Sequence, residues 1–495
     1  MLDSKAKDRP WGYGWRSSQK FVLVAVAMTM LTGKALGRAD MFLHDFMVSI
    51  LPAMLEDRLQ LDPELIQNAS LALLAESALV SFIVSPLIHH HADRFQNDKW
   101  LLAGLVGELL GSMMIASADS LMLLFSGRFV QAVANASVGV LGLSSLSRKV
   151  SLGDLDKINS IISVSLAVGT TAAPLIAGAL LQLVGYWGAW NCAFIASVIG
   201  IGLQSLMVDT PQPHGDSKVM PTDECASEAP AVDEESPLLP TAVAGNVAEL
   251  QGLPYKMIDL DLYVHLFTNA RYVGGIVSSI CYAVVSSSFS ATLPLHVCHI
   301  FQWGSFPTGL LFAAIQGPNA VLGVPVAWLK KRIGTRHPTT FGFATLAIML
   351  WLMGIPGDEQ FSWANGEIRD ILLYVGSVMG AGISMSLLNG VGMMEATSAV
   401  CELEDEHPEI FDSREGHTRA VFVTRLSSTL GTFVGAILSG TLSERRGYYA
   451  MNCASDLRTV LPFRALELEI HGPSASREAA SGETETELTE PRYTY

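Results

Sequence analysis

Asp40, Glu76, Glu108 and Arg128 are among the ionisable residues that lie inside otherwise apolar stretches of the sequence. A charge in the hydrocarbon of a bilayer is costly, so such residues face a protein interior or a wet cavity and mark a path for protons, ions or substrates. The guanidinium of Arg128 never loses its proton, so it needs a partner that faces inward. The chemistry that these residues predict is reversible binding of protons or charged molecules.

Asp40 is the best candidate for a group that titrates or that neutralises a cationic substrate. A carboxyl group withdrawn from water binds a proton more readily, so it can exchange a proton for a substrate. A structural alternative stays open, in which Asp40 is the ion-pair partner of Arg38 or Arg128. Glu76 and Glu108 also fall within apolar stretches and are candidates for the same role.

The composition indicates that the elements positioning these residues cross a membrane. Half of the 495 residues are hydrophobic and 16% are charged, against about 25% charged residues in an ordinary soluble protein. A helix needs about 20 apolar residues to cross a bilayer. Such spans are expected near residues 21–54, 70–91, 99–117, 121–143, 159–184, 187–208, 273–297, 306–329, 338–355, 371–394 and 419–440.

The spans fall into two sets, which predicts an all-α polytopic membrane protein built of two six-helix bundles. We expect an N-terminus (1–20), a first bundle (21–208), a linker (209–262), a second bundle (263–450) and an acidic tail (451–495). The linker is rich in Pro, Glu, Asp and Ser and cannot bury enough apolar surface to fold. Basic residues gather before the first span and in alternate loops, so the N-terminus and the linker are predicted to be cytosolic.

The twelfth helix of this layout is expected to be degenerate or missing. Charged side chains occur throughout residues 441–470: Glu444, Arg445, Arg446, Asp456, Arg458, Arg464, Glu467 and Glu469. An Asp or Arg in the middle of a membrane helix costs about 2.5–3.5 kcal/mol. This weakly apolar stretch cannot offset several such costs, so the sequence predicts eleven convincing spans.

Several short motifs occur in the order typical of one family of transporters. In the first half they are Asp40 with Leu51-Pro52, Asp93-Arg94, Arg128-x-x-Gln131 and Gly169 with Pro174 and Gly178. In the second half they are Ala291–Val297 and Ala327–Gly334, with Lys331 where Asp is usual. With these motifs the chain resembles the major facilitator superfamily, specifically its drug:proton antiporters and vesicular amine transporters. The resemblance covers about residues 17–450, without the linker.

The resemblance implies a role for the charged motifs. Arg128 and Gln131 would lie on the path of protons and substrate, together with the acidic residues described above. Asp93, Arg94 and Arg332 would form a latch that breaks when the two halves rock. The loop around Asp93 lacks the usual glycines, which implies a weakened latch, and an ordinary solvated loop charge is the alternative.

The glycine and proline residues of the fifth span point to close helix packing. Gly169 and Gly178 allow another helix to approach, and Pro174 allows a bend. Packing common to all membrane helices explains these residues almost as well.

Two further patterns are weaker signals. The run His89–His91 suggests a metal site, but consecutive residues on a helix point about 100° apart and cannot all bind one ion. A solvated helix end is the simpler interpretation, and no metal site is predicted. Asn68-Ala69-Ser70 is a glycosylation sequon on the predicted outer side. It adjoins the membrane, so we do not expect it to be modified.

Residues Gly33–Ala39 interrupt an otherwise normal first span. Without them the span has about 25 residues, which suits a bilayer. With them the helix is overlong and contains two cations. An insertion of this kind, together with the weak twelfth helix, suggests a mis-spliced gene or a decaying paralogue.

By resemblance, the activity is proton-coupled export of a small organic molecule, such as a drug, an amine or a secondary metabolite. Its partners would be this substrate, protons and the bilayer, in a plasma, vesicle or vacuole membrane, without nucleic acid. The sequence has no P-loop to bind a nucleotide and no nucleophile motif, so neither an enzyme nor a cofactor is predicted. The alternative is a receptor or scaffold that keeps this fold without transporting, or an inactive paralogue.

Overall fold

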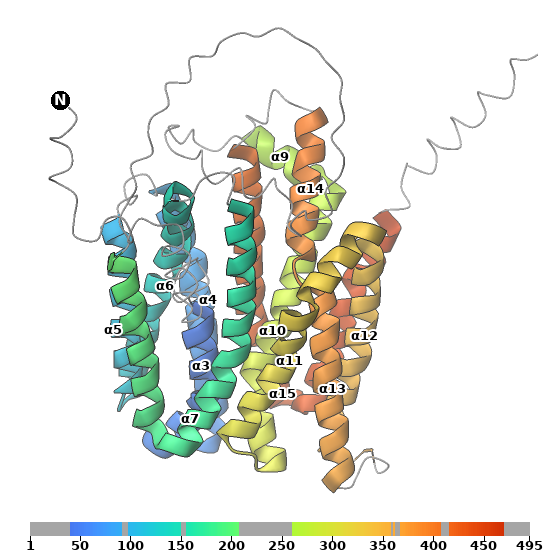
Figure 1. Ribbon diagram of the computed structural model, residues 1–495. Coiled ribbons are helices and arrows are strands. Elements are labelled where there is room, and N and C mark those ends of the chain that lie inside the picture. Colours follow the sequence, from blue (N-terminus) through green and yellow to red (C-terminus); the bar gives the residue numbers. More distant parts are fainter. Residues whose placement is uncertain are drawn as a thin grey trace, which may run out of the picture.

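The computed structural model describes residues 40–91, 98–149, 155–206, 260–357, 360–361, 367–406 and 415–469, and all regular elements in these ranges are helical (Figure 1). They are α3 (Asp40–Ala53), η1 (Met54–Arg58), α4 (Pro63–His90), α5 (Asp98–Ala116), α6 (Leu121–Lys149), α7 (Leu155–Leu206), α9 (Leu260–Thr268), α10 (Ala270–Phe301), α11 (Ser305–Ile333), α12 (Arg336–Gly354), α13 (Glu367–Leu388), α14 (Val391–Glu406) and α15 (Glu415–Glu469). Several predictions fall outside the described residues: the cytosolic N-terminus, the insertion Gly33–Ala39, the loop pair Asp93-Arg94 and the linker up to residue 259.

The helices form two bundles side by side, α3–α7 and α9–α15 (Figure 1). Helices α7 and α15 each contain two helices that meet at a glycine, Gly185 (φ 78°) or Gly447 (φ 83°). Positive φ is a conformation that glycine adopts without strain, so the chain reverses at these points. Counting both arms of α7 and α15, and α13 with α14 as one pass, each bundle has six passes. This confirms the predicted fold class.

The hydropathy of the described helices agrees with a membrane protein. Eight helical stretches among the described residues are long and apolar enough to cross a bilayer. Two of them, Val168–Gly202 and Phe422–Cys453, run through the glycine reversals. The bundles contact each other where α7 packs on α11 and where α4 packs on α15.

We call the end of the molecule where α10 passes into α11 the lower end, as it is drawn in Figure 1. Arg58 holds the first bundle together there. Its guanidinium donates to the carbonyl of Ala116 (2.8 Å), pairs with Asp119 (3.0 Å) and lies over the rings of Tyr186 and Trp187. The end of η1, the turn from α5 to α6 and the reversal of α7 are thereby fixed to one another.

The predicted span 371–394 is a broken helix in the structure. Helix α13 ends before Asn389, Gly390 has a φ of 76°, and α14 then continues to Glu406. The break leaves helix carbonyls without their usual partners. The buried ammonium of Lys330 donates to the Asn389 carbonyl (2.8 Å), and the Asn389 side-chain amide donates to Asn319 Oδ1 (2.8 Å).

Of the two alternatives for the twelfth helix, the structure shows a degenerate one. Residues 448–469 form the second arm of α15, which packs on α12. The first residues of this arm attach it to the bundle: the Tyr448 hydroxyl lies 3.2 Å from that of Tyr374, and Trp351 Nε1 donates to the Tyr449 hydroxyl. The chain thus makes a twelfth pass instead of ending after eleven. Specific contacts at its start, which a sum of hydropathies does not register, hold this polar helix.

Candidate functional site

The side chain of Arg128 is the centre of a buried polar network in the first bundle. Arg128 is 1% exposed and donates to Gln131 Oε1 (2.5 Å) and to Ser77 Oγ (3.2 Å). Gln131 donates onward to Ser112 Oγ (3.0 Å), and Ser112 donates to the backbone carbonyl of Glu108 (2.8 Å). The network therefore joins α6 to both α4 and α5 through groups that the bilayer interior could not otherwise accommodate.

Two glycines bring α5 and α6 close enough for the side chains of Ser112 and Gln131 to meet. A Cβ at Gly111 would lie 2.7 Å from the backbone nitrogen of Gln131, and one at Gly127 would lie 2.9 Å from Met114 Cβ. Arg128 follows the first residue of α6, Leu121, by seven positions. At about 1.5 Å per residue this places it about 10 Å along the helix from the lower end.

The carboxyl group of Glu76 lies beside this network. Glu76 precedes Ser77 on α4, and its charge interacts with that of Arg128. Its Oε2 atom is buried and has no hydrogen-bond partner within the described part of the chain. Glu108 is fully buried on α5, one turn before Ser112. The arrangement combines one permanent cation with two carboxyl groups that are withdrawn from water.

Four of the five predicted pathway residues thus lie on three adjacent helices. For the fifth, Asp40, the structure describes only the backbone, at the first position of α3. Sequence reasoning missed Ser77 and Ser112, which complete the network. Serine is common in membrane helices, so nothing in the sequence separates these two from the others.

The backbones of the two bundles touch where α7 crosses α11. A Cβ at Gly178 would overlap the backbone oxygen of Ser305, and a Cβ at Gly309 would overlap the backbone oxygen of Pro174. The predicted packing residues Gly178 and Pro174 therefore face α11, while Gly169 is buried further along α7. The partner glycine, Gly309, was not predicted, because the motif lies in only one of the two helices.

The bundles also meet at the lower end through side chains of α4 and α15. The Leu71 side chain fills the space beside Gly440, and Asn68 Nδ2 donates to Glu444 Oε1 (3.1 Å). Nδ2 of Asn68 is the atom that a glycan would occupy, so modification of the sequon would replace this contact. Leu295 of α10 packs among buried residues of the first bundle. The lower end is therefore closed.

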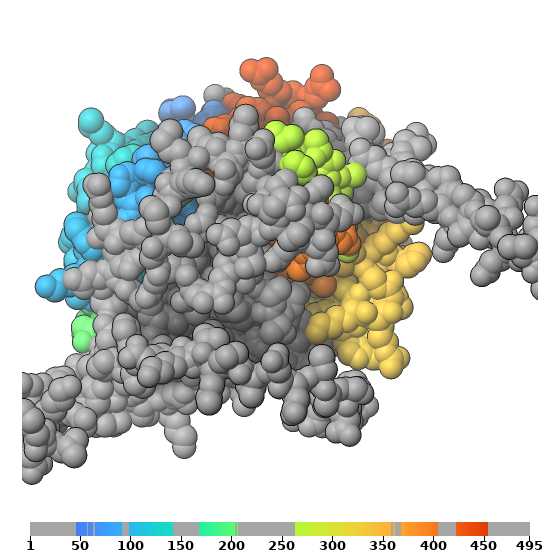
Figure 2. All heavy atoms as spheres, turned by 90° about the horizontal axis from the view of Figure 1, so that it is seen from above, coloured from blue at the N-terminus to red at the C-terminus, as the bar shows by residue number. Residues whose placement is uncertain are grey.

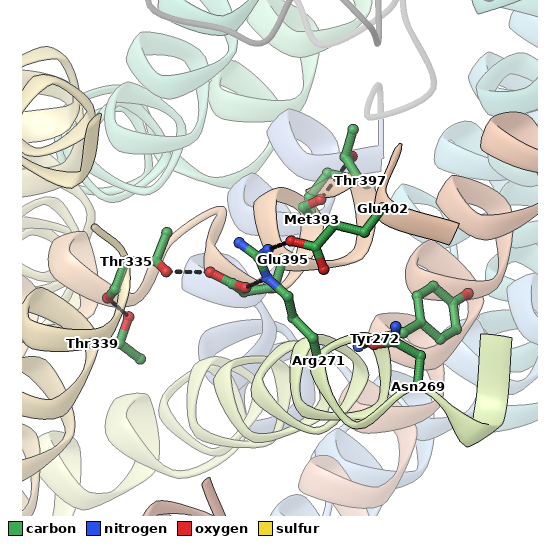
Figure 3. A network of polar contacts seen from close by, with 9 residues as sticks. All are labelled: Asn269, Arg271, Tyr272, Thr335, Thr339, Met393, Glu395, Thr397 and Glu402. Carbon is green, nitrogen blue, oxygen red and sulfur yellow. Dashed lines mark hydrogen bonds and ion pairs between the residues drawn. The ribbon is translucent and has the colours of Figure 1, made fainter. Parts of the chain in front are cut away.

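At the opposite, upper end, a charged network connects three elements of the second bundle (Figure 3). Arg271 at the start of α10 donates to Glu395 Oε2 (2.6 Å) and pairs with Glu402 on α14. The Thr335 hydroxyl, just before α12, donates to Glu395 Oε1. Thr339 Oγ1 donates to the backbone of Thr335 (2.6 Å). Glu395 thus ties α14 to both α10 and the turn that leads into α12.

The predicted latch residue Arg332 lies elsewhere at this end. Its guanidinium stacks over the ring of Trp328 on its own helix, 4.7 Å from the centroid. Asp93 and Arg94 lie outside the described residues. In the view onto the upper end, α9 is exposed at the surface (Figure 2). The bundles also touch at this end, where the His89 ring stacks on Phe422 with 4.5 Å between centroids.

Replacing Glu395 with glutamine is expected to lower thermal stability. Glu395 is 16% exposed and accepts from two elements, whereas Glu402 is 54% exposed and accepts from Arg271. Hydrogen bonds to charged groups stabilise by about 1.5–3 kcal/mol when buried, and exposed ion pairs by about 0–1 kcal/mol. Thermal unfolding in detergent should show a lower midpoint for Glu395→Gln. The matched control Glu402→Gln should unfold near the wild-type midpoint, and equal midpoints for the two variants would contradict the assignment.

Comparison with known proteins agrees with this architecture. The profile of the Major Facilitator Superfamily matches residues 23–399. The MFS-type transporter ppzB of Metarhizium rileyi is 24% identical over 487 residues, covering 94% of this chain and 98% of that protein. The class C tetracycline resistance protein of Escherichia coli is 28% identical over 158 residues, which cover 32% of this chain and 38% of that protein.

Among solved structures, the nucleoside transporter NupG has the same fold. It aligns with a TM-score of 0.62 and 13% identity, covering 92% of this chain and all of NupG.

Proposed function

The chain belongs to the major facilitator superfamily, and we propose that it exports a small organic molecule from the cytosol in exchange for protons. The membership makes it a multi-pass membrane protein and a secondary transporter. The proposal of exchange with protons rests on the buried network around Arg128, with the carboxyl group of Glu76 beside it. The similarity to a tetracycline resistance protein supports a drug-like compound as the substrate. An amine or a secondary metabolite is proposed from the resemblance of the motifs.

In this proposal a proton and the substrate compete for one carboxyl group, and this competition couples proton movement to substrate export. A carboxylate accepts hydrogen bonds from a cationic substrate when it is ionised, and loses that capacity when it binds a proton. Within the described helices, Glu76 has a buried oxygen without a hydrogen-bond partner, which suits it to either ligand. Arg128 supplies a constant positive charge that limits how strongly an ionised Glu76 retains a cation. Asp40 and Glu108 are proposed to share this role, with Gln131 orienting the guanidinium.

Alternating access would expose this site to one side of the membrane at a time. We place the upper end in the cytosol, because Lys330, Lys331, Arg332 and Arg336 lie at the turn from α11 to α12. The N-terminus and linker are then cytosolic, in a plasma, vesicle or vacuole membrane. Asp93, Arg94 and Arg332 remain the proposed latch of this end. The closed lower end supports a state in which the site is shut from the outside.

Glu76→Gln is expected to abolish transport driven by a pH gradient while leaving exchange of substrate for substrate. Glutamine keeps the volume and can still bind, but it cannot bind and release a proton. The measurement uses the full chain in proteoliposomes, with tetracycline and a panel of organic amines as probes. Gradient-driven uptake and counterflow are compared for wild type, Glu76→Gln and Asp40→Asn.

The outcomes of this assay separate the alternatives. Gradient-driven uptake by Glu76→Gln at the wild-type rate would remove Glu76 from the mechanism, and the effect of Asp40→Asn would then identify the coupling group. Absence of both uptake and counterflow for the folded wild-type chain with every probe would favour the receptor or scaffold alternative.

A further inference from the structure

A histidine near the lower end of α10 has an unsatisfied nitrogen. Nε2 of His296 is buried and has no hydrogen-bond partner among the residues that the structure describes. Most buried polar atoms in proteins are paired, so an exception requires an explanation such as a ligand or a functional role. His296 lies five residues before the end of α10 at Phe301, about 8 Å along the helix at 1.5 Å per residue.

Two tyrosines from other helices surround this imidazole. The ring of Tyr448, at the start of the second arm of α15, stacks on His296 with 3.6 Å between centroids and 12° between planes. The ring of Tyr374 on α13 lies 5.6 Å from His296, and the two tyrosine hydroxyls are 3.2 Å apart. The face of an aromatic ring attracts a cation, so the stacked Tyr448 ring would stabilise an imidazolium.

The hydrogen bond between the hydroxyls of Tyr374 and Tyr448 uses only one of their two protons, since each tyrosine carries one hydroxyl proton. The side chain of Asn452, one turn further along α15, also interacts with the Tyr448 hydroxyl. Neither tyrosine hydroxyl makes a hydrogen bond to His296 Nε2, so this nitrogen can take up a proton while the two tyrosine rings surround the imidazole.

The packing of the neighbouring residue links His296 to the movement of the bundles. Leu295 lies in the buried cluster of the first bundle with Phe46 and Trp190. When the lower end opens, Leu295 must leave this cluster, and the neighbouring His296 is then covered by the rings of its own bundle alone, Tyr374 and Tyr448. A low-dielectric interior disfavours a charged group, so protonation of His296 and opening of the lower end favour each other.

We propose that His296, with Tyr448 and Tyr374, is a proton-binding site of the second bundle that takes its proton from the outer side. The proposal rests on the proposed function, since it supplies a second proton site for the same exchange. Apart from the two tyrosines, His299, one turn later on α10, is the titratable group among the described residues whose charge acts on His296. His299 is exposed and serves as the control.

The direct test is NMR of the full chain in lipid nanodiscs, with histidine labelled at Cε1. The resonance missing from His296→Gln identifies the residue, and it is followed from about pH 8 down to about pH 3, since burial disfavours the imidazolium. We expect the resonance to titrate. Tyr448→Phe keeps the ring but removes the hydroxyl, and it should shift the titration midpoint. A His296 resonance that does not move across this range would overturn the proposal.

A transport assay separates this proposal from the one on which it rests. In proteoliposomes, His296→Gln should lose the dependence of transport on outer pH, whereas His299→Gln should keep it. Wild-type pH dependence in His296→Gln would overturn the second site and leave the proposed function intact. A titrating His296 in a chain that never couples transport to protons would overturn the proposed function and keep the proton site.

Discussion

Replacing Arg128 with lysine is expected to reduce transport at least about tenfold, equivalent to about 1.4 kcal/mol, while the chain still folds. Lysine keeps the positive charge but loses the planar set of donors that reaches Gln131 and Ser77 together. One of these buried acceptors then lacks its donor, and the position of the charge relative to Glu76 changes. The measurement is the initial rate of uptake into proteoliposomes, divided by the amount of folded protein.

The matched control for this experiment is Arg369→Lys, an exposed arginine at the start of α13. It makes the same chemical change away from the network and should leave the rate unchanged. A folded Arg128→Lys chain that transports at the wild-type rate would show that charge alone suffices. Arg128→Ala is less informative, because it removes the charge and, at the same time, the donor to two buried acceptors, Ser77 Oγ and Gln131 Oε1.

Gly309→Ala is expected to destabilise the closed arrangement of the bundles by about 1–3 kcal/mol, the usual cost of overpacking. The added methyl would overlap the backbone of Pro174, which cannot move aside as a flexible side chain can. Gly323 on the same helix has open space around it. Gly323→Ala should therefore stabilise α11 by up to about 1 kcal/mol, through helix propensity alone.

Two measurements distinguish these glycine variants. Thermal unfolding should show opposite shifts of the midpoint for Gly309→Ala and Gly323→Ala. Labelling of Leu71→Cys by a membrane-impermeant maleimide should be faster with Gly309→Ala, because the lower end opens more often. Equal labelling rates and midpoints in the two backgrounds would mean that the crossing of α7 and α11 does not control the opening of the lower end.

The polar residues of the first bundle were predictable because a charge within an apolar span is a strong signal. Arg128, Glu76 and Glu108 stand out from their neighbours, and Gln131 was noticed because it belongs to the same motif as Arg128. Their serine partners were not predictable, since Ser77 and Ser112 differ from other serines only in what faces them across a helix interface. The sequence identifies the charged side chains that are costly to bury in a membrane. The serines that form hydrogen bonds with them are common residues, and their role depends on how the helices pack.

The second bundle was predicted less well, because its features depend on contacts between distant residues. Arg271 and Glu395 are 124 positions apart, and neither lies where the family motifs directed attention. Arg332 did lie in such a motif, but it stacks on Trp328. The last helix was underestimated because an anchoring contact, such as that between Tyr448 and Tyr374, does not enter a hydropathy average.

The contact of backbone on backbone at Gly178 and Gly309 has a mechanical consequence. Where helices interlock by large side chains, relative movement requires those side chains to be withdrawn and repacked. At the crossing of α7 and α11 the glycines have no side chains that must be withdrawn, so one helix can rotate against the other without repacking. Opening on the side of α4 and α15 must instead extract Leu71 and break the bond from Asn68 to Glu444. The two sides of the interface are therefore unequal, with a pivot on one side and a closure on the other.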